Sequence, residues 1–412
     1  MNFNQRFECT TCESLVDCRI GMSNIDVQPI RFCCPSCGEA IHINIGDGKG
    51  VKVKGAKAVE FEGPFVNEYP FVDLHLDFPV TFGEYKMGHT PFLKAVGRIG
   101  HKNFGIHNAR LNGLNILHSK TKELERVLRL YSKNVNLFGR LCEKEFGETL
   151  RSEKPQDVNL ALYCVIAKVF APFSMPSENA ESVSIHMKGI KGALSSNAVA
   201  FDAFFEEIIE TDFLKNIQYD CLEIYPQILA GELAFRPALF LDFDTDNDKE
   251  LVAFRVSTDD FQKYKDLYKD ISEILSRQLI LVAGINNIIY RKDHNKFKDV
   301  GKATPKSLNQ FADLPYGFKV AHLDECWYQI SEDAINNQLR NSIAHVKAEY
   351  DDTSQVITYY PKKEGIKQEK AESMYFIDFM RKILISYREM HRLHQLIKCM
   401  FNYEYLIRKK AA

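Results

Sequence analysis

The sequence of 412 residues contains no apolar run long enough to cross a membrane. A membrane-spanning helix needs about 20 consecutive apolar residues, and the longest candidate here is LILVAGI at residues 279–285. The N-terminal stretch MNFNQRFECT has no apolar core of the kind found in signal peptides. We therefore expect a cytoplasmic protein without a membrane partner, in a compartment where thiols stay reduced.

A strong excess of charge of one sign is also missing. The 53 lysines and arginines nearly balance the 55 aspartates and glutamates, which leaves a formal net charge of −2. This balance argues against a chain that coats nucleic acid through bulk positive charge, while a local basic groove is compatible with it. The chain length favours two to four domains, and a hydrophobic content of 45% is typical of globular proteins.

No complete phosphate-binding motif is present either. GDGKG at residues 46–50 lacks the GxxxxGK[ST] spacing of a phosphate-binding loop. ALFLDFDTDND at 238–248 resembles the phosphotransfer motif of haloacid-dehalogenase-like enzymes, with Asp242 as the nucleophile and Asp244 as the acid. It has Thr245 where that family usually has glycine, and it lacks the glycine and glutamate that a calcium loop needs. We therefore expect an acidic surface turn at a domain boundary.

Cysteine, by contrast, is concentrated near the N-terminus. FECTTC contains Cys9-x-x-Cys12, and RFCCPSCG contains Cys34-x-x-Cys37. Each pair can form a tight knuckle that directs two thiolates at one ion, and two knuckles complete a tetrahedral shell of four cysteines. The pattern resembles a zinc ribbon and predicts a bound Zn²⁺. Because a closed site has no open position for water, we expect a structural or nucleic-acid-docking role for this ion.

Three further donors leave the exact ligand set open. Cys18, Cys33 and His42 lie close in sequence to the two knuckles, and Cys33 would replace Cys34 if the register slipped by one residue. In an oxidising compartment the same cysteines would instead form disulfides. The other cysteines are isolated, and we expect them to be small buried residues.

The pattern of apolar residues divides the rest of the chain. Residues 51–115 alternate and are rich in valine, phenylalanine, tyrosine and glycine, which predicts a small β-rich domain. From residue 116 the period becomes helical, beginning with one long helix over SKTKELERVLRLYSKNVNLFGRLCEKEF. The expected fold is a multidomain α+β protein with four consecutive parts: a zinc ribbon (1–50), a β-rich domain (51–115), a helical middle region (116–250) and an all-helical C-terminal domain (251–412).

Two long helices dominate the predicted C-terminal domain. Apolar residues at a spacing of three and four over 261–289 predict a helix of an antiparallel bundle, and ESMYFIDFMRKILISYREMHRLHQLIKCMFNYEYL closes the chain as a second one. Between them, SEDAINNQLRNSIAHVKAEY predicts a shorter helix that starts near Ser331. YDDTSQVITYYP then predicts a turn and a short β-hairpin.

The shorter helix has one apolar side. At roughly 100° per residue, Ile335, Leu339, Ile343 and Val346 fall on a single stripe that should face the core of the bundle.

The other side of this helix carries an arginine, an amide and an imidazole. Relative to Leu339, Arg340 lies at roughly +100°, Asn341 at roughly +200° and His345 at roughly +240°. Asn337 extends this row by one turn toward the N-terminus. A weakly charged, amide-rich row of this kind suits a covered surface, such as one formed with a second copy of the helix.

The order of these elements resembles the HEPN superfamily over residues 258–408. The matching features are a long helix, a second helix bearing Arg340-Asn341-x-x-x-His345, a short hairpin and another long helix. The resemblance implies a homodimeric four-helix-type domain, in which the two motif helices meet to form one composite site. Many members are metal-independent ribonucleases that act as toxins or antiviral-defence effectors in prokaryotes, and some lack nuclease activity.

The three motif residues suit cleavage of RNA by its own 2′-hydroxyl. Near neutral pH His345 can take the proton of that hydroxyl or give one to the departing 5′-oxygen. Arg340 would stabilise charge on the phosphorane, and Asn341 would orient His345 or hold a phosphate oxygen.

The expected activity is therefore that of a metal-independent endoribonuclease. The alternative is a non-catalytic HEPN dimerisation module whose zinc ribbon binds nucleic acid or protein. The RNA target, the activating trigger and any neutralising partner stay open.

Overall fold

The computed structural model describes most of the chain, which forms two compact units. The residues described are 1–46, 50–174, 176–244, 253–258, 261–344, 347–361 and 370–408. The sheet-bearing unit comprises residues 1–118, 230–266 and 341–384, and the helical unit comprises residues 119–229, 267–340 and 385–412. Each unit combines segments that are far apart in sequence, whereas the sequence analysis divided the chain into four consecutive parts.

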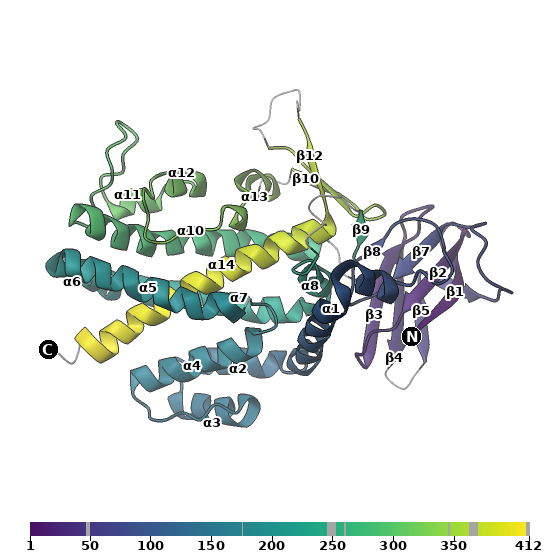
Figure 1. Ribbon diagram of the computed structural model, residues 1–412, viewed down its shortest axis with the longest axis horizontal. Helices are drawn as coiled ribbons and strands as arrows, with labels where there is room; N and C mark the ends of the chain where they lie inside the picture. The colour runs from purple at the N-terminus through teal and green to yellow at the C-terminus, as the bar shows by residue number, and fades with distance from the viewer. Residues whose placement is uncertain are drawn as a thin grey trace. The chain divides into compact units, whose positions relative to one another are not determined.

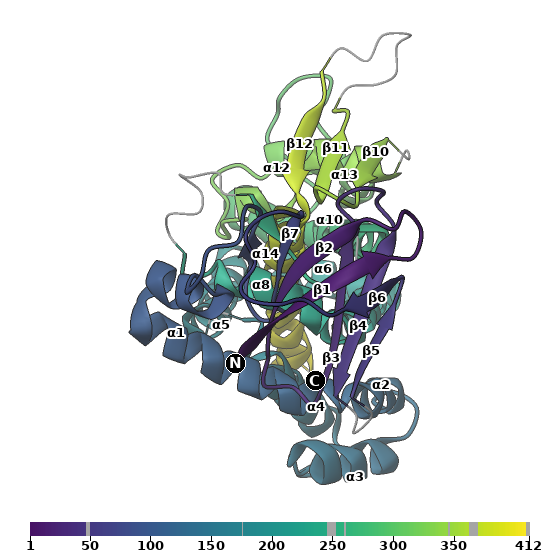
Figure 2. The ribbon, with the colours of Figure 1, turned by 90° about the vertical axis from the view of Figure 1, so that its right-hand side faces the viewer.

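The N-terminal strands form two small sheets with an apolar core between them. They are β1 (Asn2–Cys9), β2 (Leu15–Gly21), β3 (Val27–Cys33), β4 (Ala40–Gly46), β5 (Val51–Lys54), β6 (Ala56–Val59) and β7 (Phe71–Leu74). One sheet has the strand order β6-β1-β2-β7, and the other has the order β3-β4-β5 (Figure 2). All neighbouring strands are antiparallel except β2 and β7, which run parallel.

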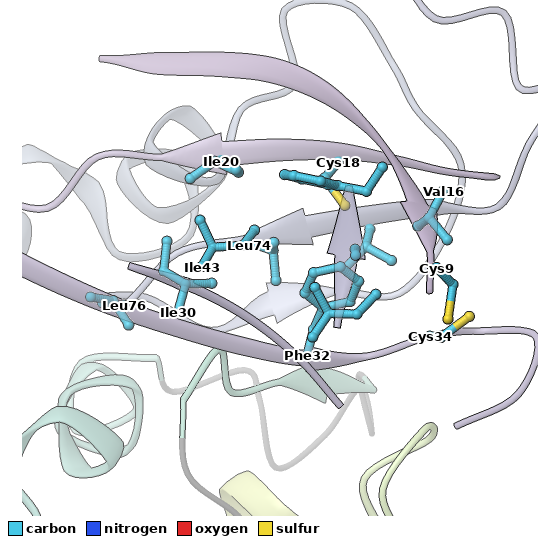
Figure 3. Close-up of a cluster of buried hydrophobic side chains, with 14 residues drawn as sticks. Cys9, Val16, Cys18, Ile20, Ile30, Phe32, Cys34, Ile43, Leu74 and Leu76 are labelled. Atoms are coloured by element: carbon cyan, nitrogen blue, oxygen red, sulfur yellow. The ribbon is translucent and has the colours of Figure 1, made fainter. Parts of the chain in front are cut away.

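The core between these sheets follows from the alternation of side chains along each strand. Ile30 and Phe32 of β3 and Ile43 of β4 belong to the same buried cluster as Cys18 and Ile20 of β2 (Figure 3). Because β5 pairs with β4 and β6 pairs with β1, the residues before and after position 50 share this core.

The chain becomes helical earlier than the sequence analysis expected. The β-rich pattern of residues 51–115 corresponds to strands only as far as β8 (Val80–Thr81), and α1 (Pro91–His118) follows. This helix is interrupted at Gly100, whose φ of 73° lies in the left-handed region. Four glycines within α1 weaken its helical pattern in the sequence, which explains why the β prediction was wrong there.

Later segments complete the sheet-bearing unit. They form α8 (Glu232–Phe240), β9 (Phe254–Arg255), β10 (Ala348–Asp351), β11 (Val356–Tyr359) and β12 (Glu372–Tyr375). β9 pairs with β8, and β10, β11 and β12 form an antiparallel sheet. The hairpin predicted after the motif helix is thus confirmed as β10 and β11.

The remaining described elements are almost entirely helical. They are α2 (Thr121–Leu130), α3 (Val135–Phe146), α4 (Pro155–Phe170), α5 (Pro176–Ser196), α6 (Ala198–Glu210), α7 (Phe213–Ala230), α10 (Phe261–Arg291), α11 (Leu308–Ala312), α12 (Tyr316–Ala321), a 3₁₀ turn (Glu332–Ala334), α13 (Asn337–Ala344), α14 (Phe376–Tyr403) and a π-helical turn (Glu404–Arg408). Within the helical unit, α5, α7 and α10 each hydrogen-bond to residues of α14 (Figure 1). None of the described helices is long and apolar enough to cross a membrane.

The two long C-terminal helices, α10 and α14, confirm the prediction from their apolar spacing. The predicted start of the second one at Glu372 is wrong, because residues 372–375 form β12, which pairs with β11. The single helix expected over residues 119–146 is wrong, because the structure has α2 and α3 there. The break occurs at Asn134, whose side chain accepts a hydrogen bond from the backbone N–H of Leu137 at 3.0 Å and so begins a new helix.

A completely buried arginine connects α8 to the rest of the sheet-bearing unit. Nε of Arg236 donates to Glu232 at 2.6 Å, Nη1 donates to Asp77 at 2.8 Å, and Nη2 donates to Asn115 at 2.6 Å. Asp77 follows β7, and Asn115 lies on α1. One guanidinium therefore supplies the hydrogen bonds that buried polar groups of three separate segments need.

Replacing this arginine should destabilise the protein strongly. We expect Arg236→Ala to reduce the free energy of unfolding by about 3–5 kcal/mol, because Glu232 and Asp77 would be left as buried, uncompensated carboxylates. Chemical denaturation followed by circular dichroism measures this loss. Lys102→Ala, at an exposed lysine of α1, is the control and should change stability by less than about 0.5 kcal/mol. Equal effects of the two substitutions would contradict the prediction.

Candidate functional site

The four knuckle cysteines meet at one end of the β-sheet core. Cys9 and Cys12 lie at the turn after β1, and Cys34 and Cys37 lie at the turn after β3. Their sulfur atoms all lie within 4.8 Å of one another. The distances from Cys9 Sγ to Cys37 Sγ and from Cys12 Sγ to Cys34 Sγ are both 3.7 Å, and Figure 3 shows the sulfurs of Cys9 and Cys34 side by side. Four cysteines so arranged can hold a metal ion.

Each knuckle is closed by the same pair of backbone hydrogen bonds. The N–H of Cys9 donates to the carbonyl of Ser14, and the N–H of Glu13 donates to the carbonyl of Cys9, both at 3.0 Å. In the second knuckle the corresponding bonds join Cys34 to Glu39 and to Gly38, both at 2.9 Å. Gly38 has a φ of 76°, which glycine adopts without strain.

The electrostatic environment of the first knuckle favours the metal-binding form of one thiol. Hydrogen bonds from the side chain and the backbone of Ser14 lower the pKa of Cys12 to about 6. The lowered pKa favours the thiolate of Cys12, which is the form that coordinates metals, whereas burial raises the pKa of the neighbouring Cys34.

The spare donors do not belong to this group. Among the described residues, the four-sulfur group contains Cys34, and its neighbour Cys33 is not part of it. Cys18 lies in the apolar core, where burial raises the pKa of its thiol. His42 lies on the exposed side of β4. The structure thus places the register at Cys34.

The motif helix α13 is shorter than predicted. Its first turn is capped by Asn336, whose side-chain oxygen accepts hydrogen bonds from the N–H groups of Gln338 and Leu339 at 3.0 and 2.9 Å. The backbone N–H of Asn336 in turn donates to the hydroxyl of Tyr268 on α10 at 3.0 Å. The predicted start near Ser331 is wrong, because this cap separates α13 from the preceding 3₁₀ turn.

The apolar stripe of the motif helix is confirmed as far as the structure describes it. Leu339 and Ile343 of α13 are 0% and 8% exposed. Ile335 is also buried, at 7% exposed, but it lies before the helix in extended backbone and is not part of the helical stripe. Val346, the fourth residue of the predicted stripe, lies outside the described residues.

The polar motif residues lie away from this stripe. Asn341 is exposed, and the side chain of Arg340 is 33% exposed and forms an ion pair with Glu273 of α10. Both ends of this ion pair are accessible to solvent, so its net contribution to stability is small. His345, the third motif residue, lies outside the described residues.

The two aspartates considered for phosphoryl transfer have structural partners instead. Asp242 accepts a hydrogen bond from Arg110 at 2.7 Å, and Asp244 accepts two from Arg98 at 2.6 and 3.1 Å. Asp244 is only 3% exposed, so the expected acidic surface turn is wrong at these positions. Both arginines belong to α1, more than 130 residues earlier in the chain, and local sequence cannot reveal such pairs.

Sequence reasoning missed a buried polar cluster in the helical unit. The hydroxyl oxygen of Tyr225 on α7 lies 2.8 Å from Nδ1 of both His391 and His394 on α14. The spacing of the two histidines places them one turn apart on α14, but nothing in their neighbourhood in the sequence points to a tyrosine of another helix.

We compared the chain with models of protein families, with curated proteins and with solved structures, and none of them matches it. Its function is therefore argued from the geometry of its own residues.

Proposed function

We propose that the protein is a metal-independent endoribonuclease of the HEPN type, acting as an antiviral-defence or toxin-type effector. In this proposal α13 supplies Arg340, Asn341 and His345 to a composite site formed by two copies of the chain. The observation that carries the proposal is the division of α13 into a buried apolar side and a side on which Asn341 and Arg340 reach solvent.

The ion pair with Glu273 suits a phosphate-binding role for Arg340. An exposed ion pair contributes at most about 1 kcal/mol, whereas a phosphodiester offers a guanidinium two oxygens in a matching geometry. RNA can therefore displace Glu273 from Arg340 at little cost. His345 would then move protons between the 2′-hydroxyl, the phosphorane and the leaving oxygen.

We further propose that the four-cysteine site binds one structural Zn²⁺. Zn–S bonds of about 2.3 Å arranged tetrahedrally place sulfur atoms about 3.8 Å apart, close to the two distances of 3.7 Å observed here. The ion would cross-link the turn after β1 to the turn after β3. With four protein ligands it offers no position for a substrate, so its contribution would be to the fold and to a surface that docks nucleic acid or protein.

Cleavage of total cellular RNA in the presence of EDTA tests the ribonuclease proposal. We expect products with a 2′,3′-cyclic phosphate and a 5′-hydroxyl, and a loss of rate of at least about 100-fold in His345→Ala and in Arg340→Ala. His101→Ala, at an exposed histidine of α1, is the matched control and should cleave like the wild type. Cleavage that survives His345→Ala, or that EDTA abolishes while the zinc content of the protein stays unchanged, would refute the proposal.

The same ion pair also favours a second candidate, a non-catalytic dimerisation module. In that case Arg340 is held by Glu273 for structural reasons, and the four-cysteine domain carries the binding activity. Glu273→Gln separates the two proposals, because it removes the negative charge that pairs with Arg340. A catalytic role predicts tighter RNA binding in this variant. A structural role predicts a weakened dimer and RNA that remains intact.

A further inference from the structure

We propose that a pocket between α2 and α7 of the helical unit binds a nucleoside phosphate. The pocket has a volume of about 480 Å³, which lies within the range of small-molecule sites. It lies entirely within the segment 119–229 of one unit, and no motif residue or knuckle cysteine lines it. The inference therefore does not depend on the proposed ribonuclease activity.

The floor of the pocket is apolar and includes an aromatic ring. Leu128 of α2 and Leu222 of α7 are 7% and 4% exposed, and Pro226 and Tyr219 of α7 are half-buried beside them. A nucleobase has two apolar faces and stacks on tyrosine, with a gain of about 1–3 kcal/mol per base. The floor thus suits a flat heteroaromatic group.

A proline within α7 adds a hydrogen-bond acceptor beside this floor. Pro226 has no N–H to donate to the carbonyl of Leu222, which lies one helical turn earlier. Both residues line the pocket. A carbonyl without its helical donor suits the exocyclic amine of a base, because such an amine supplies the missing hydrogen bond.

The charged residues around the pocket suit the remaining parts of a nucleotide. Arg129 lies in the last turn of α2 and Lys133 in the turn that follows it, and Glu125 and Glu223 are also exposed at the pocket. In the described part of the chain none of these four side chains takes part in an ion pair, although both signs are present. Two neighbouring cations repel each other weakly, and a bound phosphate would remove that repulsion.

The combination of groups favours a nucleoside phosphate over simpler occupants. A fatty acid would leave the two glutamates facing apolar surface, and inorganic phosphate would occupy only a small part of the volume. A nucleoside phosphate offers an anion to Arg129 and Lys133, hydroxyl groups to Glu223 and a base to Tyr219. The same chemistry is available from a free nucleotide and from the terminal nucleotide of an RNA.

Isothermal titration of the full-length protein tests this inference. The probes are AMP, ATP, adenosine, inorganic phosphate and a 5′-phosphorylated RNA trinucleotide. We expect binding of AMP or ATP that weakens at least tenfold in the double variant Arg129→Gln/Lys133→Gln and in Tyr219→Ala. If the trinucleotide binds and the free nucleotides do not, the pocket recognises the 5′-phosphorylated end of an RNA.

Matched controls distinguish this pocket from non-specific charge effects. Arg126→Gln changes an exposed arginine of α2 that does not line the pocket, and Tyr290→Ala changes an exposed tyrosine of α10. Both should bind like the wild type. The inference is wrong if none of the nucleotide probes binds below about 1 mM, or if Arg126→Gln weakens binding as much as the pocket variants. The titration is repeated with His345→Ala, which is expected not to cleave RNA. Unchanged nucleotide binding in this variant shows that the pocket acts independently of cleavage.

Discussion

Lowering the pH from 7 toward 4 is expected to unfold the helical unit through three buried histidines. Burial lowers the pKa of His186 and of His391 to about 4, and it lowers the pKa of His394 well below its usual range. The charges that act on them are cationic, since Arg392 faces His186, and Lys398 faces the other two. All three rings are therefore neutral in the folded protein.

The direction of the pH effect follows from this neutrality. In the unfolded chain a histidine has a pKa of about 6.5 and takes up a proton that the folded state rejects. Its contribution to stability is complete above about pH 6.5 and is lost as the pH falls from there toward 4. Near pH 4 the loss is on the order of 3 kcal/mol for each histidine. Three such losses approach the whole stability of an ordinary domain, which is about 5–15 kcal/mol.

Urea denaturation at several pH values between 8 and 5 measures this effect. His391→Asn keeps a hydrogen-bonding group near the hydroxyl of Tyr225 but cannot take up a proton. We expect this variant to be less stable at pH 8, because the smaller side chain leaves a cavity, and to lose less stability than the wild type on acidification. His101→Asn, at an exposed position, should follow the wild-type curve. Parallel curves for wild type and His391→Asn would refute the prediction.

Cys34→Ser is expected to abolish metal binding by the four-cysteine site and to unfold the two N-terminal sheets. Four thiolates in a closed shell bind Zn²⁺ with an apparent free energy of about 10–16 kcal/mol at pH 7, and this energy stabilises the fold that forms the site. The sheets are short, and their core includes Cys9 and Cys34 themselves. Without the ion, the turns after β1 and β3 lose the link between them.

Metal analysis and tryptic digestion at neutral pH measure the two consequences. We expect about one equivalent of zinc in the wild type, a value near zero in Cys34→Ser, and rapid cleavage within the first 60 residues of the variant. Cys33→Ala is the matched control, because it removes the neighbouring thiol from a buried position outside the four-sulfur group. Zinc that is lost in Cys33→Ala and retained in Cys34→Ser would show that the register is wrong.

Several features of this protein could be predicted because they depend on residues close together in the chain. The spacing of Cys9 and Cys12, and of Cys34 and Cys37, is that of two metal-binding knuckles, and tetrahedral coordination requires two knuckles to meet. The apolar spacing within α10 and α14 depends only on the geometry of the helix. The stripe through Leu339 is a local property of the same kind.

Two capping asparagines mark helix starts that local sequence already signals. Asn134 and Asn336 both begin helices that the sequence analysis placed incorrectly, and asparagine at such a position is a known start signal. The helical spacing of apolar residues continues across both asparagines, so it gives no sign that one helix ends and another begins. Two consecutive helices that pack on the same core can keep this spacing.

Other features required the folded chain. The partners of Asp242 and Asp244 on α1, the hydroxyl of Tyr225 between two histidines of α14, and the guanidinium of Arg236 among three segments all join residues far apart in sequence. The same holds for the pocket between α2 and α7. Local spacing shows which side of a helix is apolar or which thiols can share an ion. It carries no information on which distant side chain lies opposite, because that depends on how all the elements pack together.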